Sequence, residues 1–488
     1  MKKLHEILQH IEVLDQVNSL DSMVEDIVLD SRFIVSNSLF VAIKGANSDG
    51  HLYIDSAIAK GAKFIVCEIF PKEFKDHVCY VKVKNSSVAC GLIASAFYDY
   101  PSKGLKIVGI TGTNGKTTTA TLLYNLFSEM GFKCGLISTI RIKIAEKTID
   151  ATHTTPDTIN LHRYFKQMVE DGCEYCFMEV SSHAIDQNRI AGVYFTGAVF
   201  SNITHDHLDY HITFDNYFKA KKAFFDGLSA DAFALTNIDD RNGMVMLQNT
   251  AAHKYSYALK TMADFKGKLI HDSMEGMLLE INGKQVHCRL VGTFNAFNLL
   301  AVYSTAVLLG MDKDEILLKL SNLDAADGRF QFVKDGFTHR SGVVDYAHTP
   351  DALEKLIDTI KEIKSPGSKI ITVVGCGGDR DKAKRPIMGK IAAVRSDVVI
   401  LTSDNPRSEN PDTIVEEMYQ GIDENLQAKV IKIVDRAQAL KTACMLANEK
   451  DIIVVAGKGH EKYQEIKGVK IPFDDVAILE KEMSESAH

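Results

Sequence analysis

The sequence has no long hydrophobic run and no surplus of positive charge. No apolar stretch among its 488 residues approaches the length of about 20 residues that a bilayer-spanning helix needs. Its 56 Lys and Arg residues stand against 64 Asp and Glu residues, which gives a formal net charge of −8. This balance argues against a protein that binds nucleic acids or anionic membranes non-specifically. Charged residues interrupt the first sixteen positions, so we expect no signal peptide and a cytoplasmic location.

A disulfide framework is also missing from the pattern of cysteines. The nine cysteines are an odd number, and they are scattered through a chain large enough to build its own cores. Cys173 and Cys176 form one C-x-x-C pair, which suggests a redox pair or half of a zinc site. However, Cys176 begins an apolar run and no second C-x-x-C exists. We therefore favour two packed thiols.

Length and composition predict several domains. At about 150 residues per domain, the chain has room for two to four. Residues 1–98 hold short strand-like runs at 38–43, 64–67 and 78–83, and a segment rich in Pro and Gly follows at 98–104. We predict an N-terminal domain over 1–98, a central domain over 99–330 and a C-terminal domain over 331–488.

The C-terminal stretch repeats one pattern, an apolar strand that ends in polar residues and is followed by a helical segment. The strands are predicted at 370–374, 398–401 and 452–456. Continuous apolar strands that alternate with helices are typical of a parallel sheet covered on both faces, so the fold class is α/β. Ligands bind such sheets beyond the carboxyl ends of the strands. Three polar strand ends therefore predict one shared binding edge.

A phosphate-binding loop follows the predicted strand at 106–111. The sequence Gly112-Thr-Asn-Gly-Lys-Thr-Thr118 is followed by a segment whose apolar residues recur at helical spacing and which ends at Gly131. Glycines let backbone N–H groups approach phosphates, and the helix N-terminus adds positive potential. Lys116 is expected at the β- and γ-phosphates and the Thr117 hydroxyl on Mg²⁺. Position 110 is Ile where the usual motif has its first glycine, so this is a variant loop of an ATP-dependent protein.

The segment after the loop offers candidate metal ligands. Glu179 ends an apolar strand and could hold the cation that ATP chemistry requires, although a solvated carboxylate is the simpler interpretation. Residues 202–211 are dense in His, Asp and Asn, but no zinc motif supports them, and we expect most of these histidines to be structural. The segment 216–225 predicts a helix, on which Lys221 has the local pattern of a solvated surface lysine.

Taken together, the motifs resemble those of the Mur ligases, ATP-dependent enzymes that form the amide bonds of the peptidoglycan stem peptide. The resemblance spans essentially the whole chain. It rests on the phosphate loop and on the following segments: 154–157 (TTPD), 179–183 (EVSSH), 206–211 (DHLDYH), 292–298 (GTFNAFN), 328–329 (GR), 345–350 (DYAHTP), 377–381 (GGDRD) and 404–407 (DNPR). It implies a UDP-binding N-terminal domain, a central P-loop ATPase domain and a C-terminal Rossmann-like domain.

The resemblance also implies a reaction. The family members that add the third stem residue phosphorylate the D-glutamyl γ-carboxylate of UDP-N-acetylmuramoyl-L-alanyl-D-glutamate with ATP, and an amine then displaces phosphate from the acyl phosphate. The protein contributes positioning and charge neutralisation. Expected partners are ATP, Mg²⁺, this UDP substrate and meso-diaminopimelate, bound by a monomer without nucleic acid or membrane.

Residue roles carried over from the family fall into four sets. The catalytic residues are Lys116, Glu179, His207 and Lys221, of which Glu179, His207 and Lys221 would join Thr117 in binding magnesium, Lys221 as the carbamylated lysine. The ATP set comprises Gly112, Thr113, Asn114, Gly115, Lys116, Thr117, Thr118, Asn295, Asn298, Arg329, Asp345 and His348. The UDP-muramoyl-dipeptide set comprises Ser31, the turn at 45–50, Thr154, Thr155, Asp157, Ser181, Gln187, Arg189 and Lys221. The diaminopimelate set comprises Arg380, Asp404, Asn405, Pro406, Arg407, Gly457 and Glu461.

The identity of the amino acid depends chiefly on Arg407. Diaminopimelate carries a distal carboxylate that L-lysine lacks, and a guanidinium binds a carboxylate but repels a bare ammonium. Glu461 would take the distal ammonium, unless it only pairs with a neighbouring lysine. Asn-Pro turns are often exposed, so the alternative is that Arg407 is a surface residue that does not bind the substrate.

Other functions remain as alternatives. A lysine-adding ligase of the same family is the closest, followed by a ligase of the folylpolyglutamate-synthetase type, which would lack the element at 404–407. From other classes, a P-loop ATPase or kinase switch would release phosphate without a dipeptide substrate. A C-x-x-C oxidoreductase would show an unusually acidic thiol.

Overall fold

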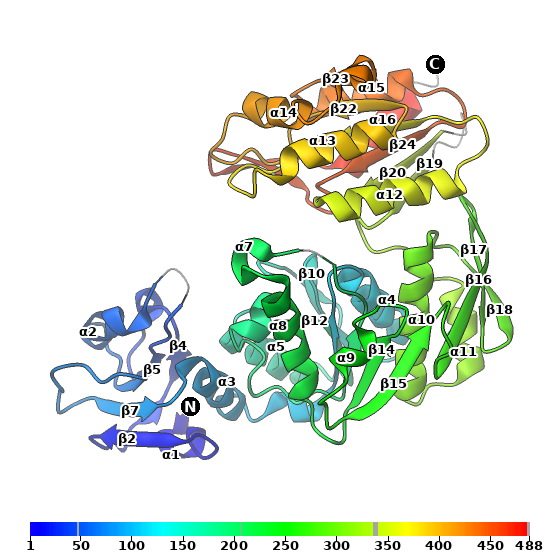
Figure 1. Cartoon of the computed structure of the whole chain (residues 1–488). Helices are drawn as coiled ribbons and strands as arrows, with labels where there is room; N and C mark the ends of the chain where they lie inside the picture. The colour runs from blue at the N-terminus through cyan, green and yellow to red at the C-terminus, as the bar shows by residue number, and fades with distance from the viewer. Residues whose placement is uncertain (46–47, 205, 335–339, 486–488) are drawn as a thin grey trace.

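The computed structural model describes residues 1–45, 48–204, 206–334 and 340–485. These residues form three main β-sheets, which lie within 1–98, 99–330 and 331–488. Figure 1 shows the corresponding bodies: the blue N-terminal part stands beside the central part, and the yellow-to-red C-terminal part lies above the central one. Within the described residues, no helix has both the length and the apolar character needed to cross a membrane.

The N-terminal sheet is mostly parallel and small. Its strand order is β2 (Val13–Val17), β7 (Cys79–Val83), β6 (Phe64–Cys67), β5 (Ser38–Val41) and β4 (Asp26–Val28), with β2 antiparallel to β7. The helices of this part are α1 (Leu4–Ile7), α2 (Ile54–Ala59) and α3 (Ser86–Phe97). Helix α3 packs against α5 (Thr158–Glu170) of the central part, and Figure 1 shows it at the junction of the two.

The central sheet contains the strand that leads into the phosphate loop. Its order is β11 (Lys147–Asp150), β10 (Arg141–Ile144), β9 (Cys134–Ile137), β12 (Tyr175–Glu179), β8 (Lys106–Thr111), β13 (Gly197–Phe200), β14 (Phe233–Asn237), β15 (His253–Ala258), β16 (Phe265–Ser273), β17 (Gly276–Ile281) and β18 (Lys284–Cys288). Strands β9, β12, β8, β13, β14 and β15 run parallel, so their carboxyl ends share one edge. Strand β8 lies between β12 and β13, which brings their ends beside the loop.

Helices cover both faces of this sheet. One core packs α4 (Lys116–Glu129), α10 (Thr293–Leu308) and α11 (Lys313–Leu320) on one face, and the other packs α5, α6 (Ser182–Asp186) and α8 (Phe214–Asp226). Two short helices, α7 (Leu208–His211) and α9 (Gly243–Met246), lie in the connections. Strand β8 is therefore buried on both sides, as its continuous apolar sequence requires.

The C-terminal sheet confirms the strands predicted from the repeated pattern. Its order is β19 (Gln331–Lys334), β20 (Ser341–Asp345), β24 (Ile452–Ala456), β21 (Ile370–Val374), β22 (Val398–Leu401) and β23 (Val430–Lys432), and all but β19 run parallel. Helices α12 (Pro350–Ile363), α13 (Lys384–Arg395) and α14 (Pro411–Tyr419) pack on one face, and α15 (Arg436–Leu446) and α16 (Asp475–Glu485) on the other. A hairpin of β25 (Tyr463–Ile466) and β26 (Val469–Pro472) follows β24. The α/β fold class is confirmed, and β24, β21 and β22 are neighbours whose ends meet at one edge.

Candidate active site

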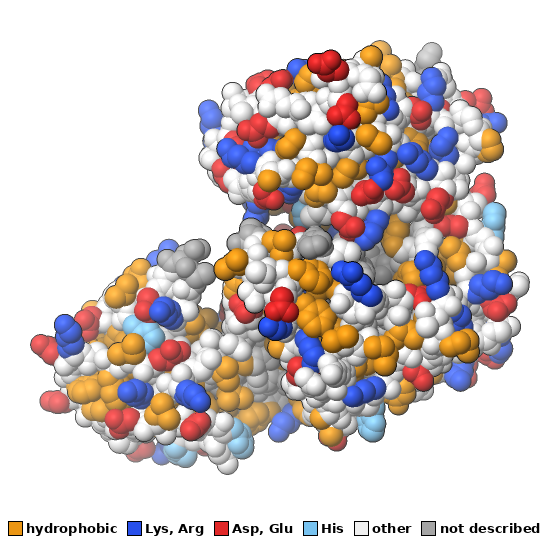
Figure 2. Space-filling model, in the orientation of Figure 1, with side chains coloured by type: hydrophobic (Ala, Val, Ile, Leu, Met, Phe, Trp, Pro, Cys, Tyr) orange, Lys and Arg blue, Asp and Glu red, His pale blue; other side chains and the backbone are white. Residues whose placement is uncertain are grey.

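A cleft of about 2210 Å³ lies between the central and C-terminal parts. Figure 2 shows the surface hollowed between these two bodies. The phosphate loop lines it from below, and the polar ends of β21, β22 and β24 line it from above. The predicted phosphate loop and the predicted binding edge of the C-terminal sheet therefore line one space.

Two glycines allow the phosphate loop its shape. Gly112 has φ of 151°, and a Cβ there would lie 1.9 Å from the Ser201 hydroxyl oxygen. Gly115 has φ of 87°, and its Cβ would lie 2.5 Å from Oδ1 of Asn298. L-residues rarely adopt these conformations. Both positions therefore require glycine, for backbone conformation and for space.

Side chains that follow β13 hold this loop, a role that could not be predicted from the sequence. The Asn202 side chain accepts from the Asn114 N–H at 3.0 Å and donates to the Asn114 carbonyl at 3.0 Å. The Ser201 hydroxyl donates to the same carbonyl at 2.6 Å. The Thr113 N–H donates to the Asn202 carbonyl at 2.8 Å. The loop is thus held in place by the protein itself.

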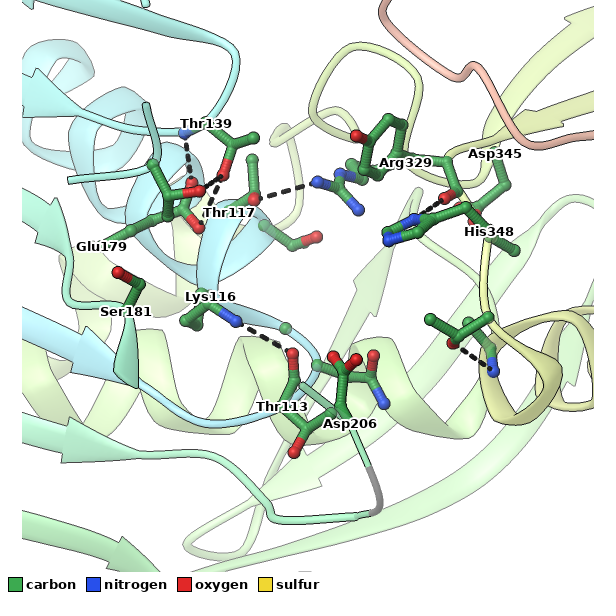
Figure 3. A pocket seen from close by; sticks show the side chains of 18 of the residues that line it. Thr113, Lys116, Thr117, Thr139, Glu179, Ser181, Asp206, Arg329, Asp345 and His348 are labelled. Carbon is green, nitrogen blue, oxygen red and sulfur yellow. Dashed lines mark hydrogen bonds between the residues drawn. The ribbon is translucent and has the colours of Figure 1, made fainter. Parts of the chain in front are cut away.

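Lys116 begins α4 and bends back over the loop. Its ammonium donates to the carbonyls of Gly112 and Thr113, both at 2.9 Å. Burial lowers the pKa of Lys116, an effect that the Glu179 and Asp206 carboxylates partly offset. Figure 3 shows Lys116 between these two acidic side chains, on the side of the space opposite Arg329 and His348.

Glu179 is fully buried at the end of β12, so the interpretation as a solvated strand end is wrong. Its carboxylate accepts from the Thr139 N–H at 2.7 Å and from the Thr139 hydroxyl at 3.2 Å. The Thr139 hydroxyl also lies 3.0 Å from that of Thr154. Thr139, which the sequence did not single out, thus fixes the orientation of the carboxylate (Figure 3).

The donor atoms at this edge suit magnesium. The hydroxyl of Thr117 and the carboxylate of Glu179 are hard oxygen donors that line the same cleft. Among the residues that the structure describes, no cluster of three or more His, Cys, Asp or Glu side chains forms a metal cage. Mg²⁺ usually keeps several waters and binds one or two carboxylates together with substrate phosphates. Mg²⁺ therefore does not need a complete set of protein ligands at this site.

Lys221 is 1% exposed, so the local pattern of a surface lysine misleads. Its ammonium donates to the Gly112 carbonyl at 2.8 Å and lies 4.7 Å from the centre of the Tyr217 ring. Burial and the nearby Lys116 ammonium lower the pKa of Lys221 well below its ordinary value. The side chain reaches the underside of the phosphate loop from α8.

His207 lines the cleft just before α7, with a left-handed φ of 54°. Its Nε2 lies 3.5 Å from a carboxylate oxygen of Asp206. Its ring contacts those of His183 and Tyr217 at centroid distances of 4.9 and 6.1 Å. His205, which belongs to the same histidine-rich segment, lies outside the described residues.

The nucleotide candidates at the third domain form one group around Tyr346, a residue that the sequence did not single out. Arg329 donates to the Thr117 hydroxyl at 3.2 Å, and its guanidinium lies 4.6 Å from the centre of the Tyr346 ring. Asp345 accepts from the Phe330 N–H at 2.7 Å, and burial raises its pKa. Burial, together with the Lys384 ammonium, lowers the pKa of His348 to about 4. Arg329 thus links this group directly to the phosphate loop.

The remaining candidates from the central domain divide between the cleft and its supports. Thr113, Asn114, Gly115, Thr118, Thr154, Thr155, Ser181, Arg189 and Asn298 line the cleft. Asn295 lies behind Asn298 and accepts from its amide at 3.1 Å. Asp157 caps α5, and Gln187 accepts from the Arg189 guanidinium at 2.6 Å.

The uridine candidates lie apart from these. Ser31 is buried in the N-terminal domain, outside the lining of the cleft. The backbone carbonyl of Ser31 accepts from Lys60 at 3.1 Å. Within the turn at 45–50, residues 46 and 47 lie outside the described residues.

Arg407 follows β22 and is not a free surface residue. Its side chain is 23% exposed and lines the cleft. The guanidinium donates through Nη1 to the Gly378 carbonyl at 2.8 Å, and Nε lies 3.3 Å from a carboxylate oxygen of Glu465. Two contacts thus fix the guanidinium at the mouth of the C-terminal pocket.

The other amino-acid candidates surround Arg407. Asp404, Asn405, Gly457, Glu461 and the exposed Arg380 line the cleft, whereas Pro406 holds the backbone between Asn405 and Arg407. A Cβ at Gly457 would lie 2.6 Å from Oδ2 of Asp404, so only glycine lets the strand end approach this carboxylate. Glu461 does pair with Lys458, its carboxylate lying 3.3 Å from the ammonium.

Ion pairs around one buried arginine support this wall of the cleft. Arg385 at the start of α13 is fully buried and contacts both carboxylate oxygens of Glu409, at 2.8 and 3.0 Å. It also donates to Glu417 at 2.7 Å and to the Gly377 carbonyl at 3.2 Å. Arg385 therefore ties the loop after β21 to the segment that follows Arg407.

The cysteines take no part in the cleft. Cys173 and Cys176 are buried free thiols, and burial raises the pKa of both. The prediction of packed thiols is confirmed, because a redox-active cysteine needs a lowered pKa and access to solvent.

Comparison with known proteins identifies the family. Three family models match, described as the Mur ligase family catalytic domain over residues 24–98, the Mur ligase middle domain over 110–306 and the Mur ligase glutamate ligase domain over 328–459. A protein of Cytophaga hutchinsonii named UDP-N-acetylmuramoyl-L-alanyl-D-glutamate–2,6-diaminopimelate ligase is 54% identical over 98% of both chains. A protein of the same name from Phocaeicola vulgatus is 51% identical, again over 98% of both chains.

Solved structures of similar proteins point to the same family. A structure described as a UDP-N-acetylmuramoyl-L-alanyl-D-glutamate–2,6-diaminopimelate ligase is 32% identical and covers 96% of this chain and 98% of its own, with a TM-score of 0.70. The MurF ligase of Thermotoga maritima, solved in complex with ADP, is 19% identical over 95% of this chain and 97% of its own, with a TM-score of 0.61, and shares the fold. With the sequence matches and the cleft described above, these findings show that the chain belongs to the Mur ligase family.

Proposed function

We propose that the chain joins meso-2,6-diaminopimelate to the D-glutamyl γ-carboxylate of UDP-N-acetylmuramoyl-L-alanyl-D-glutamate, using ATP, in peptidoglycan biosynthesis. Full-length relatives at 50–54% identity carry the name of this ligase. The observation that carries the proposal is the single cleft that is lined both by a phosphate loop and by a pocket containing Arg407, Asp404 and Glu461. We expect the enzyme to act as a monomer in the cytoplasm, where ATP is supplied.

The first chemical step is phosphorylation of the substrate carboxylate. One carboxylate oxygen attacks the γ-phosphorus of ATP, which gives an acyl phosphate and ADP. Direct condensation would have to expel hydroxide, whereas the acyl phosphate expels phosphate. Lys116 turns from the loop carbonyls to the phosphate oxygens, and Arg329 approaches them from the opposite wall, so both offset the charge that develops.

Bound Mg²⁺ supplies further charge neutralisation at the phosphates. We assign it to Thr117, Glu179, His207 and Lys221, the last as a carbamate. An unmodified ammonium at Lys221 would be a buried cation close to the Lys116 ammonium, whereas addition of CO₂ to the neutral amine, with loss of a proton, yields an anionic ligand. Thr139 holds Glu179 in place through two hydrogen bonds.

The second step is attack by the incoming amine. The amine nitrogen adds to the acyl carbon, and the tetrahedral intermediate expels phosphate. In our assignment Arg407 binds the distal carboxylate of diaminopimelate and Glu461 its distal ammonium. These two opposite charges favour diaminopimelate over L-lysine, which has no distal carboxylate to accept from Nη2 of Arg407.

A phosphate-release assay tests the proposal. The protein is incubated with ATP, Mg²⁺ and the UDP substrate, together with meso-diaminopimelate, L-lysine or no amino acid. Release that requires diaminopimelate, with the matching product mass, supports the proposal. Release with lysine alone would keep the ligase but replace the substrate, and release without the UDP substrate would favour a P-loop ATPase.

A further inference from the structure

Lys458 is a fully buried lysine two residues after the end of β24. Lysine is almost never fully buried unless it is paired. Here the ammonium donates to Oδ1 of Asn405 at 3.0 Å and to Oε2 of Glu461 at 3.3 Å. Both of these partners belong to the proposed amino-acid pocket.

The side chains of Lys458, Asn405 and Glu461 are all hydrogen-bonded to one another. The Asn405 amide donates to the same Oε2 of Glu461 at 2.6 Å. Oδ1 of Asn405 also accepts from the Glu465 N–H at 2.9 Å, which ties the set to strand β25. Because both bonds to Glu461 end on Oε2, we expect Oε1 to meet a ligand in the cleft that Glu461 lines. Lys458 thereby limits the rotation of this carboxylate.

Charge points to the same role. Burial and the carboxylate of Asp404 raise the pKa of Glu461, and the Lys458 ammonium opposes this increase. A carboxylate that lacked this neighbour would be easier to protonate and would attract an ammonium less. The lysine therefore maintains both the orientation and the charge of Glu461.

We propose that Lys458, together with Asn405, positions Glu461 for the distal ammonium of the incoming diamino acid, and so determines the affinity for that substrate. Lys458 acts through its partners and is a positioning residue. The inference rests on the proposed function, because it needs a diamino acid in this pocket. A purely structural lysine would instead support β24 and the hairpin after it, where Lys458 also lies 5.6 Å from the centre of the Tyr463 ring.

The first test replaces the charge with an apolar chain of similar length. Lys458→Met should raise KM for diaminopimelate about 10- to 150-fold, the loss expected for a hydrogen bond to a charged group, and leave KM for ATP and for the UDP substrate within about twofold. Lys467→Met, the same change at an exposed lysine outside the cleft, should change none of the three. A uniform rise in all three KM values, or an unchanged KM for diaminopimelate, would overturn the proposal.

The second test asks whether Lys458 acts through Glu461. In a double-mutant cycle, adding Lys458→Met to Glu461→Gln should raise KM for diaminopimelate by less than about twofold, because the partner is already neutral. Multiplicative effects of the two substitutions would refute action through Glu461. If Lys458→Met does not fold, Lys458→Gln, which keeps a donor for Asn405 but no charge, takes its place in the cycle. Failure of both variants to fold would mark Lys458 as a residue of stability and overturn the proposal.

The activity of the wild-type protein distinguishes a failure of the proposed function from a failure of the role proposed for Lys458. If it does not use diaminopimelate in the assay, the proposed function fails before any variant is compared. If it does, and the cycle gives independent effects, only the role of Lys458 falls.

Discussion

Replacing Arg407 by methionine should weaken the binding of diaminopimelate and leave the binding of ATP unchanged. The variant keeps a long side chain against Gly378 but removes the guanidinium. In the structure Nη1 contacts the Gly378 carbonyl and Nε contacts Glu465, which leaves Nη2 to meet a carboxylate in the cleft. Arg407→Met thus deletes the one contact that separates diaminopimelate from lysine.

The magnitude follows from that contact. A hydrogen bond to a charged group contributes about 1.5–3 kcal/mol. At about 1.4 kcal/mol per tenfold change, KM for diaminopimelate should rise about 10- to 150-fold. L-Lysine has no distal carboxylate, so its KM should change by less than about threefold. The preference for diaminopimelate over lysine should therefore fall by about the same factor as its KM rises.

Steady-state phosphate release measures both values of kcat/KM, with the amino acid varied at saturating ATP and UDP substrate. Arg289→Met, at an exposed arginine that pairs with Asp324, serves as the matched control and should behave as wild type. Equal losses for diaminopimelate and lysine would refute the assignment of Arg407 to the distal carboxylate. So would an unchanged preference.

Other changes have equally definite outcomes. Gly112→Ala should abolish turnover, because its Cβ would lie 1.9 Å from the Ser201 hydroxyl oxygen. Gly131→Ala is also at positive φ but in open space, so it should cost only about 1–2 kcal/mol of stability in urea unfolding. Turnover in Gly112→Ala would contradict the rigid loop. Arg385→Met should lower the free energy of unfolding by about 1.5 kcal/mol at neutral pH, because it removes hydrogen bonds from the buried guanidinium to the partly exposed carboxylates of Glu409 and Glu417. Arg385 lowers the pKa of Glu409 to about 2 from 4.5, so this stabilisation is present above about pH 4.5 and disappears as the pH falls through 2; wild type and variant should converge in acid, and a constant gap from pH 7 to pH 2 would refute the assignment. Chelation of Mg²⁺ should stop phosphate release, and added Mg²⁺ should restore it, whereas turnover in excess chelator would exclude the proposed ion.

Those parts of the fold that depend on local pattern could be predicted from the sequence. Strands β21, β22 and β24 begin and end at the predicted residues, because fully buried parallel strands are continuous apolar runs between polar ends. In the N-terminal domain the run at 38–43 was predicted too long, since β5 ends at Val41. The paired edges of the central and C-terminal sheets could not be derived in this way, because the docking of two domains leaves no periodic signal.

The candidate site likewise contains residues that a local pattern predicts and residues that it does not. The phosphate loop is contiguous, so its glycines and Lys116 could be recognised, and the strand ends of the third domain could be placed at one edge. The residues that hold these groups could not. Asn202 contacts Asn114 across 88 positions of the chain, and Lys458 contacts Asn405 across 53. The local sequence around Lys221 predicts an exposed lysine, whereas the side chain is buried because α8 packs beneath the loop.

Transfer of labelled oxygen tests the central claim most directly. The claim is that the substrate carboxylate is phosphorylated in this cleft before the amine attacks. The UDP substrate is prepared with ¹⁸O in its D-glutamyl γ-carboxylate, and the phosphate released during ligation with diaminopimelate is analysed by mass. An acyl phosphate predicts one labelled oxygen in every phosphate released, because the attacking carboxylate oxygen leaves with phosphorus. Unlabelled phosphate from a reaction that still forms the amide would contradict the account.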